Sequence, residues 1–391
     1  NSNYNNNLII KRISGIKFFR KRRKLAELKK LLFSKKISCV IGDSWKSFEL
    51  TIDSINSLSI PSICLAHGNE LIFKNPSKIS RVISTMNKVL HIVCNSNFTL
   101  SLVKKIGITN QKLIRIHPGA QNTINLSEQT IPNLNGSPIL VTLARLEKRK
   151  GHQFILSAIA KLKTEFPNIQ YVIAGSGIEL QNLKNLTNAL DIKKNVIFLG
   201  NINDNQKKFL FKKTNLMVMP TMDESIKGSI EGFGIAYLEA AFYSIPSIAS
   251  NNGGTAEAVI HNHTGIIISN ISEFYIVLKD LLSNKLKLKQ LGENAKIRAE
   301  NDFVAFFNSQ GNLFTLVVDM SIADGYNGFE IEVATTGGSW GDPAIDLLGD
   351  EDTQPGWGGG STITDLQYFT IPAPSVLAIL GMAGLGRRRR H

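Results

Sequence analysis

The chain has 391 residues and a formal net charge of +14, from 45 Lys and Arg against 31 Asp and Glu. This length leaves room for roughly two to three domains with their own hydrophobic cores. No RNA-binding aromatic motif or zinc-ligand spacing accompanies the positive charge, which disfavours a nucleic-acid partner. The three cysteines, Cys39, Cys64 and Cys94, are widely separated and predict buried free thiols in a reducing compartment.

The charge changes abruptly near residue 309. Residues 1–308 hold 41 of the Lys and Arg and 21 of the Asp and Glu, a net charge of +20, whereas the rest holds 4 and 10, a net charge of −6. We therefore expect two polypeptides of different origin, or a mis-assembled sequence, joined at this point. The first residue is not Met and residues 1–7 are polar without a secretory apolar region, which predicts a fragment cut inside a domain.

Residues 11–36 are strongly basic, with twelve Lys or Arg and Glu27 as the acid among them. Two interpretations stay open: a surface attracted to anionic lipid, or a helix of the first domain whose charged face lies in water. Apolar residues at roughly helical spacing predict a basic amphipathic helix in either case, namely Phe18, Leu25, Leu28 and Leu32.

Short apolar runs alternate with helical segments before and after a polar linker, residues 122–137, and predict parallel sheets covered on both faces. Ligands bind such sheets at the carboxyl ends of the strands, where His67 falls. Asn95 or Ser96 is expected to cap the helix that follows. The expected strands are 37–41, 62–66, 90–94, 113–116, 139–143, 171–174, 196–199, 216–219, 247–249 and 265–268, with further helices near 272–307.

The segment from Glu231 to Glu239 sets two carboxylates eight positions apart around a Gly-Phe-Gly turn. We expect Glu231 and the glycines in a loop and a helix that begins near Ile235. Free backbone N–H groups and the positive end of the helix dipole would then lie beside the acids, an arrangement that holds phosphate. Carboxylates around an anion site suit a nucleotide sugar; the alternative is a pair of solvated surface charges.

Arg145 and Lys150 follow the expected strand 139–143, where side chains point into the cleft at the edge of a sheet. Two cations there can neutralise a diphosphate and stabilise the charge that grows on it as it leaves. For their neighbours Lys148 and Arg149, we favour a solvated basic loop.

Together these segments resemble the donor domain of a family 4 retaining glycosyltransferase with the GT-B fold, over about residues 138–303. The segments 67–70 and 95–99 resemble the acceptor-side domain of the same family, particularly of members that add mannose to lipid or polysaccharide acceptors. The donor-domain resemblance rests on the order and spacing of Arg145, Lys150-Gly151, Gly175-Ser176-Gly177, Glu231 to Ala240, and Gly253-Gly254 with Glu257.

The resemblance implies a role for each matching residue. Arg145 and Lys150 would hold the diphosphate, Glu239 the ribose hydroxyls and Glu231 the hexose hydroxyls, while His67 would lie by the sugar's C6 hydroxyl and reacting carbon. Residues 232–235 would lend backbone N–H groups. The implied catalytic residues are thus His67, Arg145, Lys150 and Glu231, and the implied donor-binding residues are Gly151, Gly175, Gly177, Gly232, Phe233, Gly234, Ile235 and Glu239.

The resemblance also implies a reaction without a metal or another cofactor. The cations and a helix N-terminus supply the countercharge of the diphosphate, and the leaving phosphate itself takes the acceptor's proton. The sequence departs from the family at both ends. The first strand and glycine-rich loop of the acceptor domain would precede residue 1, and the helix that crosses back to that domain would follow Phe307. Donor binding would survive these departures even where turnover is lost.

Other motifs are weaker. His261 and His263 lack a partner at a metal-ligand spacing and predict a surface loop. The acidic run 350–352 resembles the metal motif of the other glycosyltransferase fold but has no flanking strands. Gly175-Ser176-Gly177 is not completed to G-x-G-x-x-G, which disfavours a dehydrogenase. We therefore predict no metal site.

The C-terminal part carries a different signal. Residues 309–370 are acidic, glycine-rich and β-prone, like a piece of an extracellular β domain. A Pro-containing segment 371–375, an apolar run 376–385 and the arginines 387–390 resemble a PEP-CTERM sorting signal; the alternative is a chance apolar terminus. A sorting signal needs an exported protein, so the two parts of the chain imply incompatible locations.

The sequence thus predicts a bacterial retaining glycosyltransferase of the cytoplasm, peripheral to the inner membrane, that moves a mannose-type or glucose-type hexose from a nucleotide-diphosphate sugar to a lipid or polysaccharide acceptor. Two alternatives remain: a PEP-CTERM-sorted surface or matrix protein, whose tail would make it a membrane-anchored sorting intermediate, and a non-catalytic nucleotide-binding module. The expected domains are an acceptor-side domain 1–121, a linker 122–137, a donor domain 138–308, an acidic segment 309–370 and an anchor 371–391.

Overall fold

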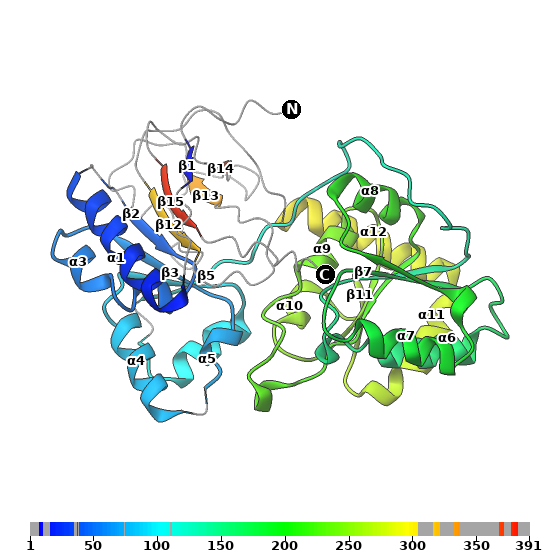
Figure 1. The fold of residues 1–391 in the computed structure, drawn as a ribbon. Helices are drawn as coiled ribbons and strands as arrows, with labels where there is room; N and C mark the ends of the chain where they lie inside the picture. Colours follow the sequence, from blue (N-terminus) through cyan, green and yellow to red (C-terminus); the bar gives the residue numbers. More distant parts are fainter. Residues whose placement is uncertain are drawn as a thin grey trace. The chain divides into compact units, whose positions relative to one another are not determined.

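The computed structural model describes residues 8–10, 16–34, 37, 39–73, 75–109 and 112–303, and four short strands at 316–320, 332–335, 367–370 and 377–381. The chain divides into two units, residues 1–116 with 306–391, and residues 117–305 (Figure 1). Among the residues that the structure describes, none of the helices combines the length and the apolar character needed to span a bilayer. The acidic run 350–352 and most of the expected anchor 371–391 lie outside these residues.

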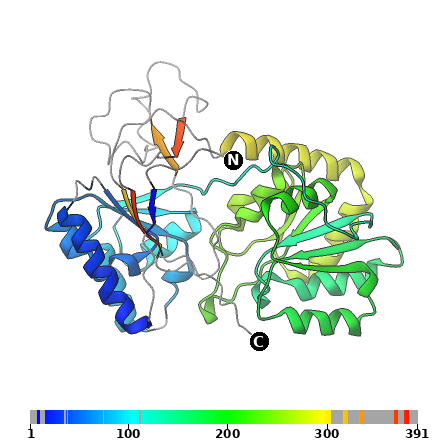
Figure 2. The same cartoon turned by 45° about the horizontal axis from the view of Figure 1, so that its top comes forward.

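The first unit contains a parallel sheet whose strand order is β1-β15-β12-β2-β3-β4-β5 (Figure 2). A separate antiparallel pair joins β13 (Glu332–Thr335) to β14 (Gln367–Thr370). The strands of the sheet are β1 Leu8–Ile10, β2 Cys39–Gly42, β3 Ser62–Ala66, β4 His91–Cys94, β5 Leu113–Arg115, β12 Leu316–Met320 and β15 Leu377–Gly381. The helices are α1 Lys17–Ser34, α2 Trp45–Phe48, α3 Ile52–Asn56, η1 Asn69–Leu71, α4 Pro76–Met86 and α5 Asn97–Lys105.

Apolar side chains of the helices and strands form the core of the first unit. Leu28 and Leu32 of α1 are buried in it, as their helical spacing predicts. The thiols of Cys39, Cys64 and Cys94 are free and buried, which confirms the expectation from the sequence. The side chain of Ser96 accepts a hydrogen bond from the amide of residue 99 and so caps α5.

The second unit is built around a parallel sheet whose strand order is β11-β10-β9-β6-β7-β8. Its strands are β6 Ile139–Leu143, β7 Gln170–Ala174, β8 Val196–Gly200, β9 Leu216–Met219, β10 Ser247–Ser250 and β11 Gly265–Ile268. The helices and helical turns are η3 Lys148–Lys150, α6 His152–Leu162, α7 Leu180–Ala189, η4 Lys193–Asn195, α8 Asp204–Lys213, η5 Ser225–Lys227, α9 Ile235–Ala241, α10 Thr255–Ala258, η6 Ile271–Glu273, α11 Phe274–Ser283 and α12 Lys285–Asp302.

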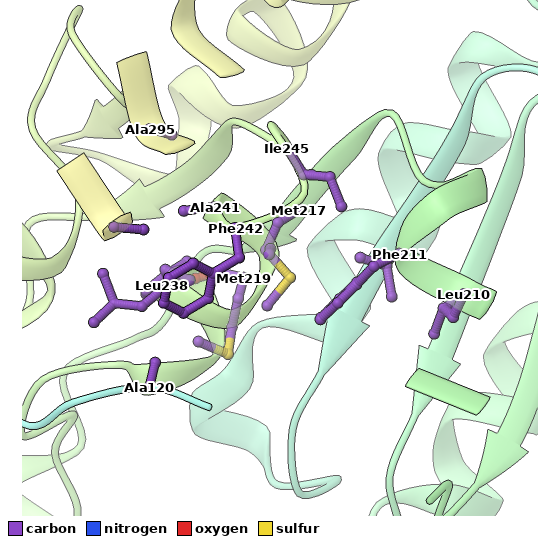
Figure 3. Packing of buried hydrophobic residues seen from close by; sticks show 14 of the residues in the cluster. Ala120, Leu210, Phe211, Met217, Met219, Leu238, Ala241, Phe242, Ile245 and Ala295 are labelled. Carbon is purple, nitrogen blue, oxygen red and sulfur yellow. Dashed lines mark hydrogen bonds between the residues drawn. The ribbon is translucent and has the colours of Figure 1, made fainter. Parts of the chain in front are cut away.

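Both faces of this second sheet are buried, because side chains alternate between them along each strand. Met217 and Met219 of β9 pack in one cluster with Leu238 of α9 and with Phe242, which directly follows α9 (Figure 3). Val218 lies between them in sequence and packs in the other cluster, which also contains apolar residues of α6 and α11. In Figure 1, α8, α9 and α12 lie on one side of the sheet, and α6, α7 and α11 lie on the other.

The order of the strands places a topological switch between β6 and β9. The chain runs outward from β6 through β7 to β8, then returns to the other side of β6 and continues through β9, β10 and β11. In parallel α/β sheets, ligands bind outside the carboxyl ends of the two strands that flank such a switch. The segments that follow β6 and β9 are therefore where a ligand is expected.

Candidate functional site

Two loops pack on each other at the carboxyl ends of β6 and β9. The amide of Met222, in the β9 loop, donates to the carbonyl of Arg149 in the β6 loop at 2.7 Å. Gly151 has a φ of 75°, and a Cβ atom there would lie 2.2 Å from the carbonyl oxygen of Pro220. Glycine at residue 151 thus allows both the turn and the close approach of the loops.

Five charged side chains alternate in sign across these two loops. Arg145 pairs with Glu147 at 2.9 Å, and Glu147 pairs with Arg149 at 3.4 Å. Arg149 donates from Nη1 to Oε2 of Glu231 at 2.7 Å, and Nζ of Lys150 contacts the same oxygen at 2.5 Å. The structure therefore brings together three residues predicted from the sequence, Arg145, Lys150 and Glu231, through two others, Glu147 and Arg149.

The sequence predicted that Arg149 lies in a solvated loop, and for this residue the prediction is wrong. Its side chain is only 3% exposed, whereas Lys148 beside it is exposed. Residues 148–150 form a 3₁₀ turn, in which consecutive side chains point about 120° apart. One cation of the run therefore faces water while the next faces Glu231.

One carboxylate oxygen of Glu231, Oε2, accepts hydrogen bonds from two cations. Burial alone would raise the pKa of Glu231, but the charges and hydrogen bonds of Lys150 and Arg149 hold the pKa below its usual value. The same burial lowers the pKa of Lys150, and the attraction of Glu231 offsets part of this. Both cations contact Oε2, and among the described residues no hydrogen bond reaches Oε1. An ionised oxygen at this position can accept hydrogen bonds from a ligand's hydroxyl groups.

The Gly-Phe-Gly turn is a loop, and α9 begins at Ile235, as predicted. The carbonyl of Glu231 accepts a hydrogen bond from the amide of Gly254 at 2.9 Å, and a Cβ atom at Gly253 would lie 1.9 Å from the same oxygen. The Gly253-Gly254 pair thus fixes the backbone of Glu231. Phe233 as a whole is 2% exposed, and its ring packs in the core rather than facing a ligand.

Glu239 lies on α9 and has its own counterion. Nζ of Lys207, on α8, contacts Oε1 of Glu239 at 2.5 Å and Asp204 at 3.1 Å. Burial would lower the pKa of Lys207, but Glu239 and Asp204 raise it above its usual value, which keeps the ammonium charged. Lys207 was not predicted to belong to the site, because nothing in the sequence of α8 marks it as a partner of α9.

Gly175 and Gly177 have a packing role. A Cβ atom at Gly175 would lie 2.0 Å from the carbonyl oxygen of Ala144, and one at Gly177 would lie 2.4 Å from that of Leu146. The two glycines therefore let the loop after β7 pack against the backbone that carries Arg145. No described contact tests their predicted role in donor binding.

His117 was not singled out from the sequence. Its Nε2 lies 3.0 Å from Oε2 of Glu257, and its ring packs against Phe233 and Phe303 with centroids 5.1 and 5.9 Å away. These contacts support the loop that follows Glu231. These contacts could not be predicted from the sequence, where His117 is simply a histidine before a Pro-Gly turn.

In the first unit, His67 follows β3, as predicted, and its side chain is 44% exposed. Burial acts to lower its pKa, but a 3.2 Å hydrogen bond to Asp43 and the charges of Glu70 and Asp43 raise it overall. Oε1 of Glu70 accepts a hydrogen bond from the backbone amide of His67 at 2.7 Å. Asp43 was not predicted from the sequence to belong to this cluster.

Neither histidine of the loop 261–263 has a metal-ligand environment. Nδ1 of His261 accepts the amide of Ile267 at 3.1 Å, and the carbonyl of His263 accepts a bond from Asn294. Within the described ranges, no group of three His, Cys, Asp or Glu side chains could hold a metal ion.

Comparison with known proteins places the paired loops in a family. Residues 126–298 match the family model described as "Glycosyl transferases group 1". This part of the chain is therefore similar to glycosyltransferases of group 1. The matched residues include the five ion-paired residues described above, as well as Lys207, Glu239 and Glu257.

A curated relative of this chain is a GDP-mannose-dependent alpha-(1-6)-phosphatidylinositol monomannoside mannosyltransferase from Mycolicibacterium smegmatis. It is 27% identical over 161 residues, which make up 41% of this chain and 42% of the relative. An alpha-1,3/1,6-mannosyltransferase, ALG2 of Dictyostelium discoideum, is 26% identical over 264 residues, 58% of this chain and 60% of the relative. The chain spans less than half the length of the first of these relatives.

Among solved structures, Anabaena Alr3699/HepE in complex with UDP and glucose matches with a TM-score of 0.63 and 16% identity, over 75% of this chain and 81% of that protein. At this identity the likeness concerns the fold. It confirms the α/β class and the GT-B fold that were predicted from the sequence.

Proposed function

We propose that the chain is a hexosyltransferase that moves a mannose-type or glucose-type sugar from a nucleotide-diphosphate sugar to a lipid or polysaccharide acceptor, with retention at the reacting carbon. The observation that carries the proposal is Glu231, an ionised carboxylate held by two cations at the switch point of a glycosyltransferase domain, with one oxygen left for a ligand. The mannosyltransferases and the UDP-bound structure among its relatives support the substrate class.

In the proposed reaction, Arg145 and Lys150 bind the diphosphate and stabilise its growing charge as the bond to the sugar breaks. Arg145 is 48% exposed, so it can reach a ligand without being extracted from the core. Because two fixed cations supply the countercharge, the proposed reaction runs without a metal ion, and the leaving phosphate accepts the proton of the attacking hydroxyl. The backbone N–H groups of residues 232–235 would assist the same charge.

The two glutamates would recognise the sugars of the donor. We assign Oε1 of Glu231 to the hexose hydroxyls and the carboxylate of Glu239 to the ribose hydroxyls, because an ionised carboxylate is an acceptor that matches hydroxyl donors. His67 would lie by the C6 hydroxyl and the reacting carbon. Gly151, Gly175 and Gly177 would contribute mainly by allowing the loops to pack.

A screen for hydrolysis and transfer tests this proposal. GDP-mannose, GDP-glucose, UDP-glucose and UDP-galactose would be incubated with the chain, with a double variant Glu231→Ala, Lys150→Ala, and with Lys148→Ala as the matched control. We expect release of the nucleoside diphosphate from at least one donor, loss of this release in the double variant, and little change in the control. Release that the double variant retains would contradict the proposed site. Donor binding without release would favour the non-catalytic alternative.

We also propose that the exposed side of α1 makes the peripheral membrane contact. Phe19, Ala26 and Phe33 are spaced by seven residues and therefore lie on one side of the helix, opposite the buried Leu28 and Leu32. Phe19 is 51% exposed and Phe33 is 69% exposed. This apolar row is separate from the row noted in the sequence, of which Leu28 and Leu32 are buried in the core.

Exposed cations flank the row: Arg22, Arg23, Lys29 and Lys30. Aromatic side chains with basic neighbours on an exposed helical face match the surface of an anionic bilayer. Attachment to the cytoplasmic face of the inner membrane is the location that we propose, and the buried free thiols fit a reducing compartment.

An environment-sensitive fluorophore on Phe33→Cys tests the contact, with Ile178→Cys as the matched control, because Ile178 is 87% exposed in the other unit. The native cysteines are buried, so labelling is directed to the new thiol. We expect a blue shift at residue 33 with anionic vesicles, a weaker shift at high salt, and no shift at residue 178. Equal signals with neutral and anionic vesicles would contradict the role of the cations.

A further inference from the structure

The guanidinium of Arg149 joins the two halves of the candidate site. Nη1 donates to Glu231 at 2.7 Å, Nη2 lies 3.4 Å from Glu147, and Glu147 in turn holds Arg145. The backbone of Arg149 is fixed as well, because its carbonyl accepts the amide of Met222 from the loop after β9. This side chain therefore reaches Glu231 from a backbone that has little freedom to move.

Packing alone does not account for Arg149. The side chain is 3% exposed, and its Nε has no hydrogen-bond partner among the described residues. A buried donor without an acceptor destabilises a fold, and an apolar side chain of similar size would avoid that cost. What a guanidinium provides, and an apolar side chain would not, is the pair of contacts from Nη1 to Glu231 and from Nη2 to Glu147.

Lys150 and Arg149 share a single oxygen, Oε2 of Glu231. In the proposed function, Lys150 binds the diphosphate, and phosphate oxygens would draw its ammonium away from that carboxylate. Among the side chains that the structure describes, Arg149 would then be the cation that still contacts Glu231. Without it, a largely buried carboxylate would face a bound anion with no counterion, and its pKa would rise.

We propose that Arg149 is a positioning residue for Glu231. It keeps the carboxylate ionised and turned so that Oε1 faces the donor's hexose while Lys150 is engaged with the diphosphate. This inference rests on the proposed function for the identity of the ligand, but the control of Glu231 by Arg149 can be measured without any ligand.

Within the described part of the chain, the charged and titratable groups that face Glu231 come from two elements. Arg149 and Lys150 belong to the turn η3, and Tyr237 belongs to α9, where burial first and then the charge of Glu231 raise the pKa of its hydroxyl. Lys148 belongs to the same turn but is exposed. It provides a control that carries the same charge change in the same segment.

The first test measures the titration of Glu231 directly. Carbon-13 NMR of glutamate carboxyl groups, with Glu231→Gln to assign the signal, would be recorded for the wild type, Arg149→Met, Arg149→Lys and Lys148→Met. We expect a raised pKa of Glu231 in Arg149→Met, a value close to wild type in Arg149→Lys, and no change in Lys148→Met. An unchanged pKa in Arg149→Met would overturn the inference. If the Met variant fails to fold, Arg149→Gln keeps a similar shape and decides the same question.

The second test separates positioning from direct phosphate binding. Calorimetry would compare the affinity for a nucleoside diphosphate with that for the corresponding nucleotide sugar. We expect Arg149→Met to weaken nucleotide-sugar binding by about tenfold to a hundredfold and to leave nucleoside-diphosphate binding within about threefold. Arg149→Lys should recover part of the loss. An equal loss for both ligands would overturn the inference, because it would mean that Arg149 contacts the diphosphate itself. If the wild type bound neither ligand, the proposed function would fail and the NMR titration alone would decide the role of Arg149.

Discussion

His152 is the first residue of α6 and lies fully buried behind the loop that carries Arg145 and Lys150. Its Nδ1 is 2.9 Å from the hydroxyl of Tyr171, and its Nε2 has no hydrogen-bond partner among the described residues. Burial, helped by the charge of Lys150, lowers the pKa of His152 to about 4. The imidazole is therefore neutral in the folded protein over the physiological range.

We predict that His152 makes stability depend on pH. The unfolded chain binds the proton below about pH 6.5, whereas the folded chain binds it only near pH 4, so the contribution of the neutral ring is complete above pH 6.5 and is lost as the pH falls toward 4. Between pH 7 and 4.5, the free energy of unfolding should fall by about 2–3 kcal/mol from this group. Urea unfolding followed by circular dichroism should show a flatter pH dependence in His152→Gln. Equal slopes in the two proteins would contradict the assignment.

Two glycines allow a controlled test of how the loops pack. Gly151 and Gly200 both have a positive φ, 75° and 67°, but a Cβ atom would clash with Pro220 at Gly151 and would meet nothing within 4 Å at Gly200. We expect Gly200→Ala to destabilise by about 1–2 kcal/mol through backbone strain alone. Gly151→Ala should cost about 1–3 kcal/mol more, because the loop must shift. Thermal unfolding measures both, and equal losses would contradict the steric role of Gly151.

Arg145, Lys150 and Glu231 could be proposed from the sequence, because their order relative to the expected strands resembled a known donor domain, and ion pairs link them in the structure. The sequence was insufficient for Arg149. Lys148 and Arg149 are adjacent cations, and only the 3₁₀ turn decides that one is exposed and the other meets Glu231. A contact across 82 positions of the chain cannot be read from local charge.

At the scale of elements, α8 is held at its start by a capping box. The side chain of Asn203 accepts the amide of Gln206, and the side chain of Gln206 accepts the amide of Asn203. These bonds satisfy amides that the first turn of a helix leaves without partners. The helix positions Lys207, which pairs with Glu239 of α9.

We predict that Asn203→Ala destabilises the second unit by about 1 kcal/mol, because the cap is lost. Asn188→Ala, on the exposed side of α7, is the matched control and should change stability by less than about 0.5 kcal/mol. Denaturant unfolding of both variants is the measurement. A loss in the control as large as that in Asn203→Ala would show that the cap has no special part in stability.

Elements could be predicted wherever their signal was local. The apolar runs located strands such as β6 and β9 closely, and the Gly-Phe-Gly turn located the start of α9 at Ile235. The capping-box residues of α8, Asn203 and Gln206, are visible in the sequence but were not used to predict the start of this helix. The exposed aromatic row of α1 was missed because Phe19 and Phe33 could not be told from core residues before the buried side of the helix was known.

At the scale of the whole chain, alternation of strands and helices predicted parallel sheets but not the order of their strands. That order depends on pairing between strands distant in sequence, and it creates the switch point between β6 and β9. The change of charge near residue 309 remains the basis for proposing a separate origin for the C-terminal part. The boundaries 122–137 and 138–308 likewise remain a proposal for the linker and the donor domain.

We propose that the loops after β6 and β9 form a binding site for a nucleoside diphosphate. Calorimetric titration of the full chain with GDP and with UDP tests it most directly, with Lys150→Met and Lys148→Met as the paired variants. We predict binding of at least one nucleotide by the wild type and by Lys148→Met, and an affinity lower by about tenfold to a hundredfold in Lys150→Met. A folded wild-type chain that binds neither nucleotide, or equal affinity in the two variants, would contradict the claim.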